Sequence, residues 1–307
     1  MAVRGKIIKS IAGFYEVHTS DPAAGSVTYR CRAKGVFRAL KQKPLVGDDV
    51  EIEITDPVSV PPEGNVVKLL PRKNDLIRPN VANVDQALLL FAITYPVPSY
   101  NMVDRFLITM GRKDLPAILC FNKQDLARPD EIRELRETYE ACGCKVLFLS
   151  ALDEIGIRSV GRILEGKTTV VTGPSGAGKS SLINRLCPDA RLETGELSKK
   201  IGRGKNTTRH VELFFAGNDT FLVDTPGFTS LSLFDLKAEQ IRNFYPEFEP
   251  YAPECRFHGC NHLTEPGCAV RQAVQEGRIS RIRYQNYTEI FAQQKAVRPD
   301  YGKRDPR

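Results

Sequence analysis

Residues 173–180 have the residue types and spacing of a loop that binds phosphate groups. They read GPSGAGKS, which satisfies the pattern G-x-x-x-x-G-K-[ST] between an apolar run and a helical segment. Glycines let the backbone wrap closely around phosphate, so that successive N–H groups and the helix N-terminus face the negative charge. We expect Lys179 to reach the β and γ phosphates of a nucleotide and Ser180 to ligate Mg²⁺. The predicted nucleotide-binding residues of this loop are Gly173, Pro174, Ser175, Gly176, Ala177, Gly178, Lys179, Ser180 and Ser181.

A second phosphate-binding motif, DTPG, directly follows the apolar run TFLV. It spans residues 224–227 and begins 46 positions after Gly178. An acidic residue at the C-terminal end of a parallel strand can hold Mg²⁺ through water, and the N–H of a following glycine can face the γ-phosphate. On its own this pattern is typical of a turn. Its distance from the glycine loop favours a catalytic role for Asp224 and Gly227.

A third motif, NKQD at residues 122–125, could recognise guanine. The ring N1–H and the exocyclic amine of guanine lie side by side, so one carboxylate can accept hydrogen bonds from both, and adenine offers no such edge. We assign that carboxylate to Asp125, with Asn122 bracing the loop and Lys123 lying along the base plane. The dipeptide SA that ends the run KVLFLSA could supply a backbone N–H to the guanine carbonyl. The predicted guanine-site residues are Asn122, Lys123, Gln124, Asp125, Ser150 and Ala151.

The order of these motifs along the chain is unusual, because the tetrad begins 51 positions before the glycine loop. Read cyclically from residue 170, the parts are the glycine loop, a polar stretch at 194–209, D-x-x-G, an apolar run, the tetrad and SA. This is the usual sequence of parts in a GTP-binding domain, with the chain cut after D-x-x-G. The sequence therefore predicts a circularly permuted domain.

The elements that must position these motifs alternate between strands and helices. From about residue 81, apolar runs such as ALLLFAIT, AILCF, KVLFLSA and TTVVTG alternate with helical segments such as MVDRFLITMGRK and PDEIRELRETYEACG. This alternation predicts a parallel sheet with crossover helices. We assign residues 76–232 to an α/β P-loop GTPase domain.

Residues 1–75 show short strand signals separated by Gly, Pro and Asp, and no helical pattern. Such a pattern predicts a small antiparallel barrel, for which an OB-fold that binds nucleic acid is our assignment and an SH3-like barrel is the alternative. Residues 1–80 carry 13 Lys or Arg against nine Asp or Glu, and residues 277–307 carry eight against three. Basic flanks of this kind suit a polyanionic partner, although they also serve solubility.

Residues 233–307 combine short helical segments with the cluster C-x4-C-x-H-x5-C, and we assign them to a helical zinc-binding domain with a basic tail. Three thiolates and an imidazole suit a closed tetrahedral zinc site, whose role is structural because no coordination position is open. His258 is a rival to His262 as the fourth ligand. The predicted zinc ligands are Cys255, Cys260, His262 and Cys268.

Other features limit the class of protein. The longest apolar runs fall short of the roughly 18 residues of a membrane span, and the N-terminal residues lack the pattern of a signal peptide. Five of the eight cysteines are scattered rather than arranged as a disulfide framework. We therefore expect a cytoplasmic protein with no membrane association.

Taken together, the motifs NKQD, GPSGAGKSS, GRGKNTTRH and DTPGF and the cysteine cluster resemble the RsgA-type circularly permuted GTPases, over essentially the whole chain. The resemblance implies an OB-fold in front, a zinc site behind, binding of 16S rRNA and GTP hydrolysis stimulated by the 30S subunit. Family members commonly carry a histidine where this chain has Asn206, which leaves the group that positions the attacking water open. The switch threonine that meets Mg²⁺ is Thr207 or Thr208. We place Thr208 with Ser180 at the metal and include both threonines in the catalytic set.

The leading hypothesis is a GTPase that binds the small (30S) ribosomal subunit and 16S rRNA and assists late maturation of the subunit. Hydrolysis of GTP to GDP and phosphate would control binding and release. The alternative is a GTP-dependent RNA-binding module whose hydrolysis is incidental. We expect one structural Zn²⁺, Mg²⁺ bound with GTP, and a monomeric state.

Overall fold

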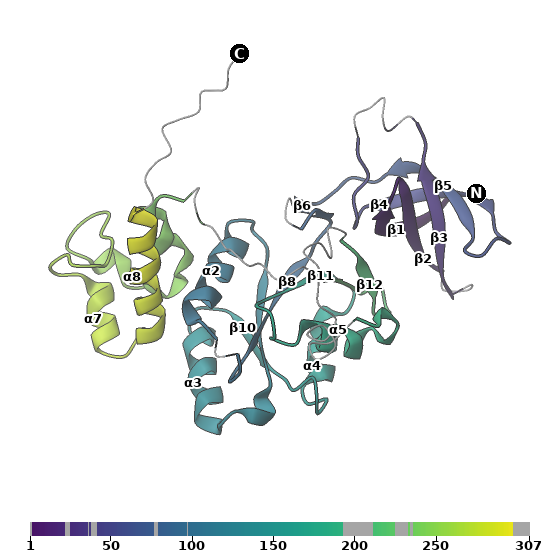
Figure 1. Cartoon of the computed structure of the whole chain (residues 1–307). Coiled ribbons are helices and arrows are strands. Elements are labelled where there is room, and N and C mark those ends of the chain that lie inside the picture. The colour runs from purple at the N-terminus through teal and green to yellow at the C-terminus, as the bar shows by residue number, and fades with distance from the viewer. Residues whose placement is uncertain are drawn as a thin grey trace, which may run out of the picture.

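A computed structural model of the chain shows three parts: a β-barrel, a central α/β unit and a helical unit, with the barrel and the helical unit at opposite ends of the molecule (Figure 1). The structure describes residues 2–21, 25–35, 37, 42–76, 79–96, 98–192, 211–224, 233 and 236–296. Several residues named from the sequence lie outside the described residues, namely Thr207, Thr208 and Gly227 of the catalytic set, together with Asn206. The polar stretch 194–209 and the chain beyond residue 296 also lie outside them.

The barrel is built from five strands: β1 (Ala2–Ile11), β2 (Phe14–Asp21), β3 (Gly25–Ala33), β4 (Asp49–Asp56) and β5 (Glu63–Leu69). They close in the order β1-β2-β3-β5-β4, with β1 paired to β4. The continuous run GKIIKSIAGFYEVHT is divided into two strands at Ala12 and Gly13, which both have positive φ. Alternate side chains such as Ile7, Val17 and Ile52 are fully buried inside. The OB-type barrel predicted from the sequence is confirmed.

The central sheet has six strands: β8 (Gln86–Ala92), β9 (Ala117–Asn122), β10 (Lys145–Phe148), β11 (Thr168–Thr172), β12 (Leu213–Phe215) and β13 (Phe221–Asp224). Their order is β10-β9-β8-β11-β13-β12, and all neighbours are parallel except β12, which pairs antiparallel with β13. The parallel sheet predicted from the alternation of strands and helices is confirmed, and β12 is added to it as an antiparallel edge strand. The reason is that β12 joins β13 through a short turn, which allows only antiparallel pairing.

Helices cover both faces of the sheet. Val103 and Phe106 of α2 (Tyr100–Gly111) and Leu135 of α3 (Pro129–Glu140) belong to the same buried cluster as Leu89 and Phe91 of β8. On the opposite face, helices α4 (Ile157–Leu164) and α5 (Lys179–Leu186) pack against the alternate residues of β8 and β9. The sheet is thus buried on both sides, which explains why its strands are continuous apolar runs.

The barrel contacts the sheet at its edge strand. Lys9 of β1 forms an ion pair of 2.9 Å with Glu212, and the two residues also make a β-bridge. The ring of His18 lies 4.1 Å from the ring of Phe215 on β12, and burial lowers the pKa of His18. A two-stranded ribbon of β6 (Asp75–Leu76) and β7 (Val81–Ala82) connects the two units.

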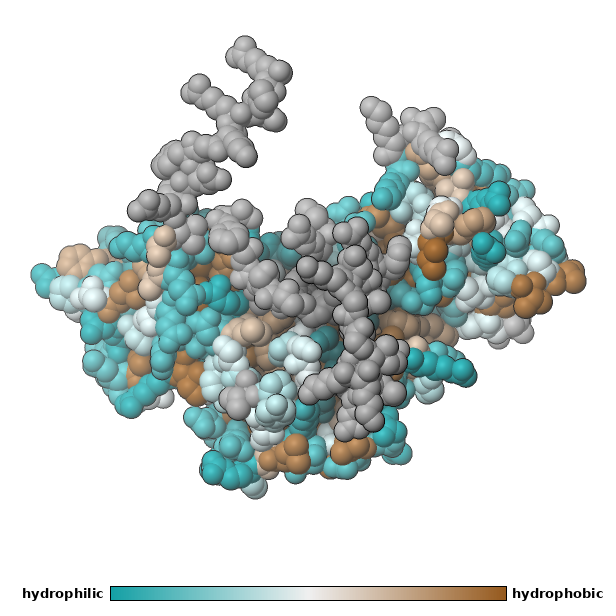
Figure 2. All heavy atoms as spheres, in the orientation of Figure 1, coloured by the Kyte–Doolittle hydropathy of each residue, from teal (hydrophilic) through white to brown (hydrophobic). Residues whose placement is uncertain are grey.

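The helical unit contains α7 (Ala269–Gln275) and α8 (Arg281–Ala296). The segment LKAEQIRNFYPEF, expected to be helical, forms the 3₁₀ helices η3 (Ala238–Phe244) and η4 (Pro246–Phe248), and η5 (Ala252–Glu254) follows. Helix α8 packs against α2 of the central unit. Among the described residues, no helix is long and apolar enough to cross a membrane. Hydrophilic side chains dominate the face shown in Figure 2, with hydrophobic ones interspersed among them.

Candidate nucleotide site and metal cluster

The predicted nucleotide motifs meet at one edge of the sheet. Asn122 is the last residue of β9, the glycine loop follows β11, and Asp224 is the last residue of β13. Because β8, β9, β11 and β13 are parallel, their C-terminal ends lie at the same edge, which is where ligands bind in open α/β sheets. Asp224 pairs in register with Val171, two positions before the glycine loop.

The conformation of the glycine loop depends on residues without side chains. Gly176 and Gly178 have φ values of 80° and 94°, in the left-handed region that glycine favours. A Cβ atom on Gly173 would lie 1.9 Å from the carbonyl oxygen of Leu90, and one on Gly178 would lie 2.2 Å from Nδ2 of Asn122. The loop therefore lies directly against β8 and the tetrad, and it ends at the N-terminus of α5, where backbone N–H groups favour anions.

Lys179 provides the cation of this loop. Its Nζ donates hydrogen bonds of 2.9 Å to the carbonyl oxygens of Gly173 and Pro174, so the side chain folds back over the loop. Burial lowers the pKa of Lys179, while the nearby negative charge of Asp224 raises it. A half-buried ammonium group that folds over a glycine loop is suited to bind an anionic phosphate.

Asn122 connects the three nucleotide motifs. Its side chain is buried, and its Nδ2 donates to the carbonyl oxygen of Ala177 in the glycine loop at 2.8 Å. Its Oδ1 accepts from the backbone N–H of Lys123 at 2.8 Å and from that of Ala151 at 3.0 Å. One amide thus holds the glycine loop, the tetrad and the SA loop together.

Two further groups at this site were missed by the sequence analysis. Arg185 of α5 donates to the carbonyl oxygens of Ala151 at 3.2 Å and Leu152 at 3.4 Å, and it pairs with Glu154 at 2.5 Å. Arg185 therefore fixes the SA loop to the helix that begins at the glycine loop. The only signal in the sequence was a cation in the last turn of that helix, which is common on exposed surfaces.

The second missed group is the loop after β8. Nζ of Lys123 donates to the carbonyl oxygen of Tyr95, whose side chain is 75% exposed. A Cβ atom on Gly176 would lie 3.3 Å from Cδ of Pro96. The segment Tyr95–Pro96 thus lies beside both the tetrad and the glycine loop.

The remaining predicted residues occupy the same region. Gln124 and Asp125 lie in the 3₁₀ helix η1 (Gln124–Leu126), and Asp125 is exposed. Ser150 is fully buried, and its hydroxyl accepts from the N–H of Asp153 at 3.1 Å. Ser180 is the second residue of α5.

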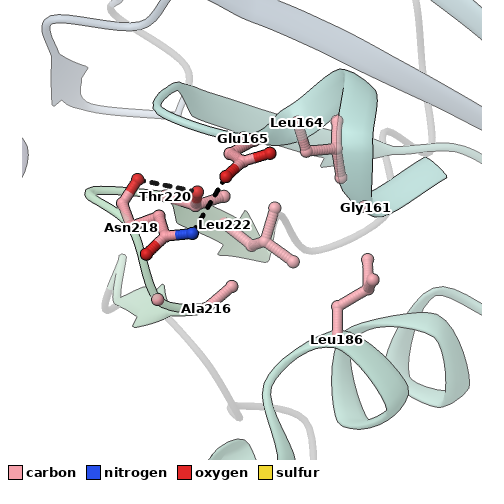
Figure 3. Close-up of a pocket in the computed structure, with 9 residues that line it drawn as sticks. Gly161, Leu164, Glu165, Leu186, Ala216, Asn218, Thr220 and Leu222 are labelled. Carbon is pink, nitrogen blue, oxygen red and sulfur yellow. Dashed lines mark hydrogen bonds between the residues drawn. The ribbon is translucent and has the colours of Figure 1, made fainter. Parts of the chain in front are cut away.

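A separate pocket of about 230 Å³ lies at the opposite end of α5 (Figure 3). Leu186, the last residue of α5, lines it together with Leu164 and Glu165 and the turn that joins β12 to β13. Asn218 of that turn donates to Glu165 at 2.9 Å. Because α5 begins at the glycine loop and ends at this pocket, the pocket is distinct from the nucleotide site.

The cysteine cluster is assembled in the helical unit. The ligand atoms of Cys255, Cys260, His262 and Cys268 all lie within 4.8 Å of one another, and His258 is not part of this group. Nδ1 of His262 is 3.6 Å from the Cys255 sulfur and 3.5 Å from the Cys268 sulfur. Three sulfurs and one imidazole nitrogen converging in this way fit a tetrahedral zinc ion.

The surroundings of the cluster hold its loops in place. Tyr284 and Tyr287 of α8 donate to the carbonyl oxygens of His262, at 2.7 Å, and Asn261, at 2.5 Å. Burial raises the pKa of the Cys260 thiol to about 12 and lowers that of His262. A bound metal would replace the thiol protons and stabilise the thiolates, so metal binding and the packing of this unit are coupled.

Comparison with known proteins assigns the family. Residues 69–234 match the family model described as RsgA GTPase, and residues 4–58 match the RsgA N-terminal domain. The chain belongs to the RsgA GTPase family. The prediction of a GTP hydrolase of this family is thereby confirmed.

Curated members of the RsgA family match along nearly the whole chain. A protein named small ribosomal subunit biogenesis GTPase RsgA, from Agathobacter rectalis, is 48% identical, with 95% of this chain and 98% of the relative covered. The protein of the same name from Alkaliphilus metalliredigens is 44% identical, with 96% and 99% covered.

Solved structures of similar chains share the fold. YloQ, described as a circularly permuted GTPase, has a TM-score of 0.76 at 35% identity, with 98% of each chain covered. YjeQ from Thermotoga maritima has a TM-score of 0.73 at 31% identity, with 97% of this chain and all of YjeQ covered. The predicted circular permutation of the RsgA GTPase domain is confirmed.

Proposed function

We propose that this protein binds GTP at the edge formed by β9, β11 and β13, hydrolyses it to GDP and phosphate, and acts in late maturation of the small (30S) ribosomal subunit. The observation that carries the proposal is the position of Asn122, whose amide joins three nucleotide motifs into one site. Membership of the RsgA family and the names of the relatives in Agathobacter and Alkaliphilus support the role in subunit biogenesis.

Guanine recognition is assigned to the tetrad and the SA loop. Asp125 would accept hydrogen bonds from the N1–H and the exocyclic amine of the base. A backbone N–H of the segment Ser150–Ala151 would meet the guanine carbonyl, and it would have to exchange its present acceptor, Ile155 for Ser150 or Asn122 for Ala151, for the base. Arg185 supports this geometry because it holds the carbonyl oxygens of Ala151 and Leu152. Adenine would leave the carboxylate without a partner, so the site should reject it.

Phosphate binding is assigned to the glycine loop and the groups that face it. The backbone N–H groups of the loop and Lys179 would bind the β and γ phosphates, and Ser180 and Thr208 would hold Mg²⁺. Bound Mg²⁺ would neutralise charge that develops on the phosphate oxygens. Asp224 and the N–H of Gly227 would face the γ-phosphate. Thr207 remains the alternative to Thr208.

Binding to 16S rRNA is assigned to the barrel and the basic tail. On the barrel, the ring of Phe14 lies 4.2 Å from the guanidinium carbon of Arg30 and 4.7 Å from that of Arg32. An aromatic ring beside two exposed cations can stack on a base and neutralise phosphate at the same time. We place one structural Zn²⁺ at the cysteine cluster and propose a cytoplasmic monomer.

The test measures GTP turnover with and without purified 30S subunits, using the full-length protein. The residue after D-x-x-G is Phe228, which can neither donate nor accept a hydrogen bond, so intrinsic turnover should be slow, about 10⁻⁴ to 10⁻² per second. We expect 30S subunits to raise it by orders of magnitude. If 30S subunits leave the rate of GTP turnover unchanged, the result would instead support the alternative, an RNA-binding module with incidental hydrolysis.

Sedimentation with 30S subunits tests the nucleotide dependence of binding. We expect more protein to pellet with a non-hydrolysable GTP analogue than with GDP, because a nucleotide can bias only states that it contacts differently. Arg30→Gln should reduce pelleting and leave turnover without 30S unchanged, whereas Lys179→Ala should abolish nucleotide binding. Equal pelleting with analogue and GDP would contradict a nucleotide-controlled release.

A further inference from the structure

The turn after α3 brings two cysteine sulfurs together. In Cys142-Gly143-Cys144 the two Sγ atoms are 3.5 Å apart, and the Cys142 sulfur is also 3.0 Å from the carbonyl oxygen of Tyr139. Gly143 has a φ of 77°, and a Cβ atom there would meet nothing within 4 Å. The tight turn is therefore possible because of the glycine, and it leaves both thiols on the same side of the chain.

The two thiols form a hydrogen bond with each other. Hydrogen bonding with the Cys144 thiol lowers the pKa of Cys142, and the positive charge of Arg283 lowers it further, against the burial that raises it. The same hydrogen bond raises the pKa of Cys144. By contrast, burial alone raises the pKa of Cys31 to about 12. The pair therefore loses its first proton more readily than an isolated buried thiol does.

We propose that Cys142 and Cys144 form a reversible disulfide with each other by exchange with small-molecule disulfides such as oxidised glutathione. In the first step one thiolate attacks a sulfur of the small disulfide, which breaks its S–S bond and releases one thiolate. In the second step the neighbouring thiol loses its proton and attacks the mixed disulfide, which releases a second thiolate. Two protein thiols are oxidised and one disulfide is reduced to two thiols.

The location of the pair connects it to the packing of the helical unit. The turn follows Tyr139, whose ring lies 5.7 Å from the guanidinium carbon of Arg283 in α8. The residue before Tyr139 is Thr138, and its hydroxyl oxygen lies 3.5 Å from the hydroxyl oxygen of Ser280. The disulfide would thus modify the segment of the GTPase domain that contacts the zinc-binding unit.

The experiment treats the zinc-loaded, full-length protein with oxidised glutathione and alkylates the free thiols before digestion. Trypsin releases both cysteines in one peptide, residues 137–145 (ETYEACGCK), and a disulfide within it lowers its mass by two hydrogens and blocks alkylation. We expect this peptide to be oxidised, to return to the dithiol with dithiothreitol, and to react well before the peptides of Cys120 and Cys187.

A variant separates the two steps of the exchange. Cys144→Ser should retain glutathione on Cys142 as a mixed disulfide, whereas the wild-type chain should release it. Cys142→Ser serves as the reciprocal variant, in which the adduct should remain on Cys144. Any of three results for this peptide in the wild-type protein would overturn the proposal. The peptide could stay fully alkylated, it could oxidise only after the protein is unfolded, or it could keep glutathione as a mixed disulfide.

Discussion

The substitution Arg283→Met tests how the helical unit is held to the GTPase domain. Arg283 of α8 is 2% exposed and pairs with Asp104 of α2 at 2.5 Å and with Glu247 of η4 at 2.7 Å. Tyr245 completes the group by donating to Asp104 at 3.1 Å. Methionine has a similar length but no charge, so the substitution leaves two buried carboxylates without their cation.

The expected loss of stability follows from these contacts. Arg283 makes three charge-assisted hydrogen bonds, and at about 1.5–3 kcal/mol each they set an upper bound of about 5–9 kcal/mol. Relaxation, water entry and protonation of the carboxylates reduce that figure. We therefore expect the free energy of unfolding to fall by about 3–5 kcal/mol, as for other broken buried ion pairs.

The loss should depend on pH. Burial raises the pKa of Asp104 above its ordinary value, and the charge of Arg283 opposes that effect. Without Arg283 the folded-state pKa of Asp104 rises further, while the unfolded value stays near about 4. Between these two values the folded state binds more protons than the unfolded state, so the variant loses stability as pH rises. The substitution should cost less at pH 5 than at pH 8.

Urea unfolding followed by circular dichroism at both pH values measures this difference. Arg278→Met is the matched control, because Arg278 lies in the same unit, is half exposed, and makes its ion pair with Glu276 and its 5.0 Å contact with the ring of Tyr251 near the surface. It should cost less than about 1 kcal/mol at either pH. The reasoning would be refuted if Arg283→Met lowered the free energy of unfolding by no more than the control does, or by the same amount at pH 5 and pH 8.

Three further predictions concern the proposed sites. Asp125→Asn should weaken GTP binding and raise the relative affinity for XTP, because the amide N–H of Asn can donate to the carbonyl that replaces the exocyclic amine of guanine. Competition of XTP against labelled GTP measures this, and an unchanged ranking of the two nucleotides would reject the role of Asp125. Metal analysis should find about one zinc per chain, and Cys260→Ser should lower both zinc content and melting temperature; zinc-free protein purified without chelators would contradict the site. Gly178→Ala should weaken GTP binding at least tenfold, or about 1.4 kcal/mol, because its Cβ would lie 2.2 Å from Asn122; unchanged affinity in a nucleotide titration would contradict the loop geometry.

The sequence by itself determined the circular permutation and the positions of the nucleotide motifs along the chain. The order of glycine loop, D-x-x-G and tetrad is a property of the chain alone, so the circular permutation was predictable without coordinates. Local periodicity was equally informative, because strands buried on both faces must be continuous apolar runs and barrel strands must alternate. Glycines with positive φ, such as Gly176 and Gly178, were recognisable because few other residues adopt that backbone.

Some sequence patterns are compatible with more than one fold or ligand set, and in those cases only the tertiary structure distinguished the alternatives. OB and SH3-like barrels have similar strands, and the closure of β1 onto β4 with β5 between β3 and β4 distinguishes them. His258 and His262 are both near the cysteines in sequence, but the chain path brings only His262 into the group of four. The antiparallel direction of β12 likewise depends on the turn that joins it to β13.

The contacts that connect the units were not predictable, because their partners are far apart in the chain. Arg283 and Asp104 are separated by 179 positions, and Lys9 and Glu212 by 203. Local propensity describes the turn or helix in which each residue lies, and it carries no information about the element packed against it. Which charges become buried together is decided by the packing of whole helices and strands, and only the folded chain shows it.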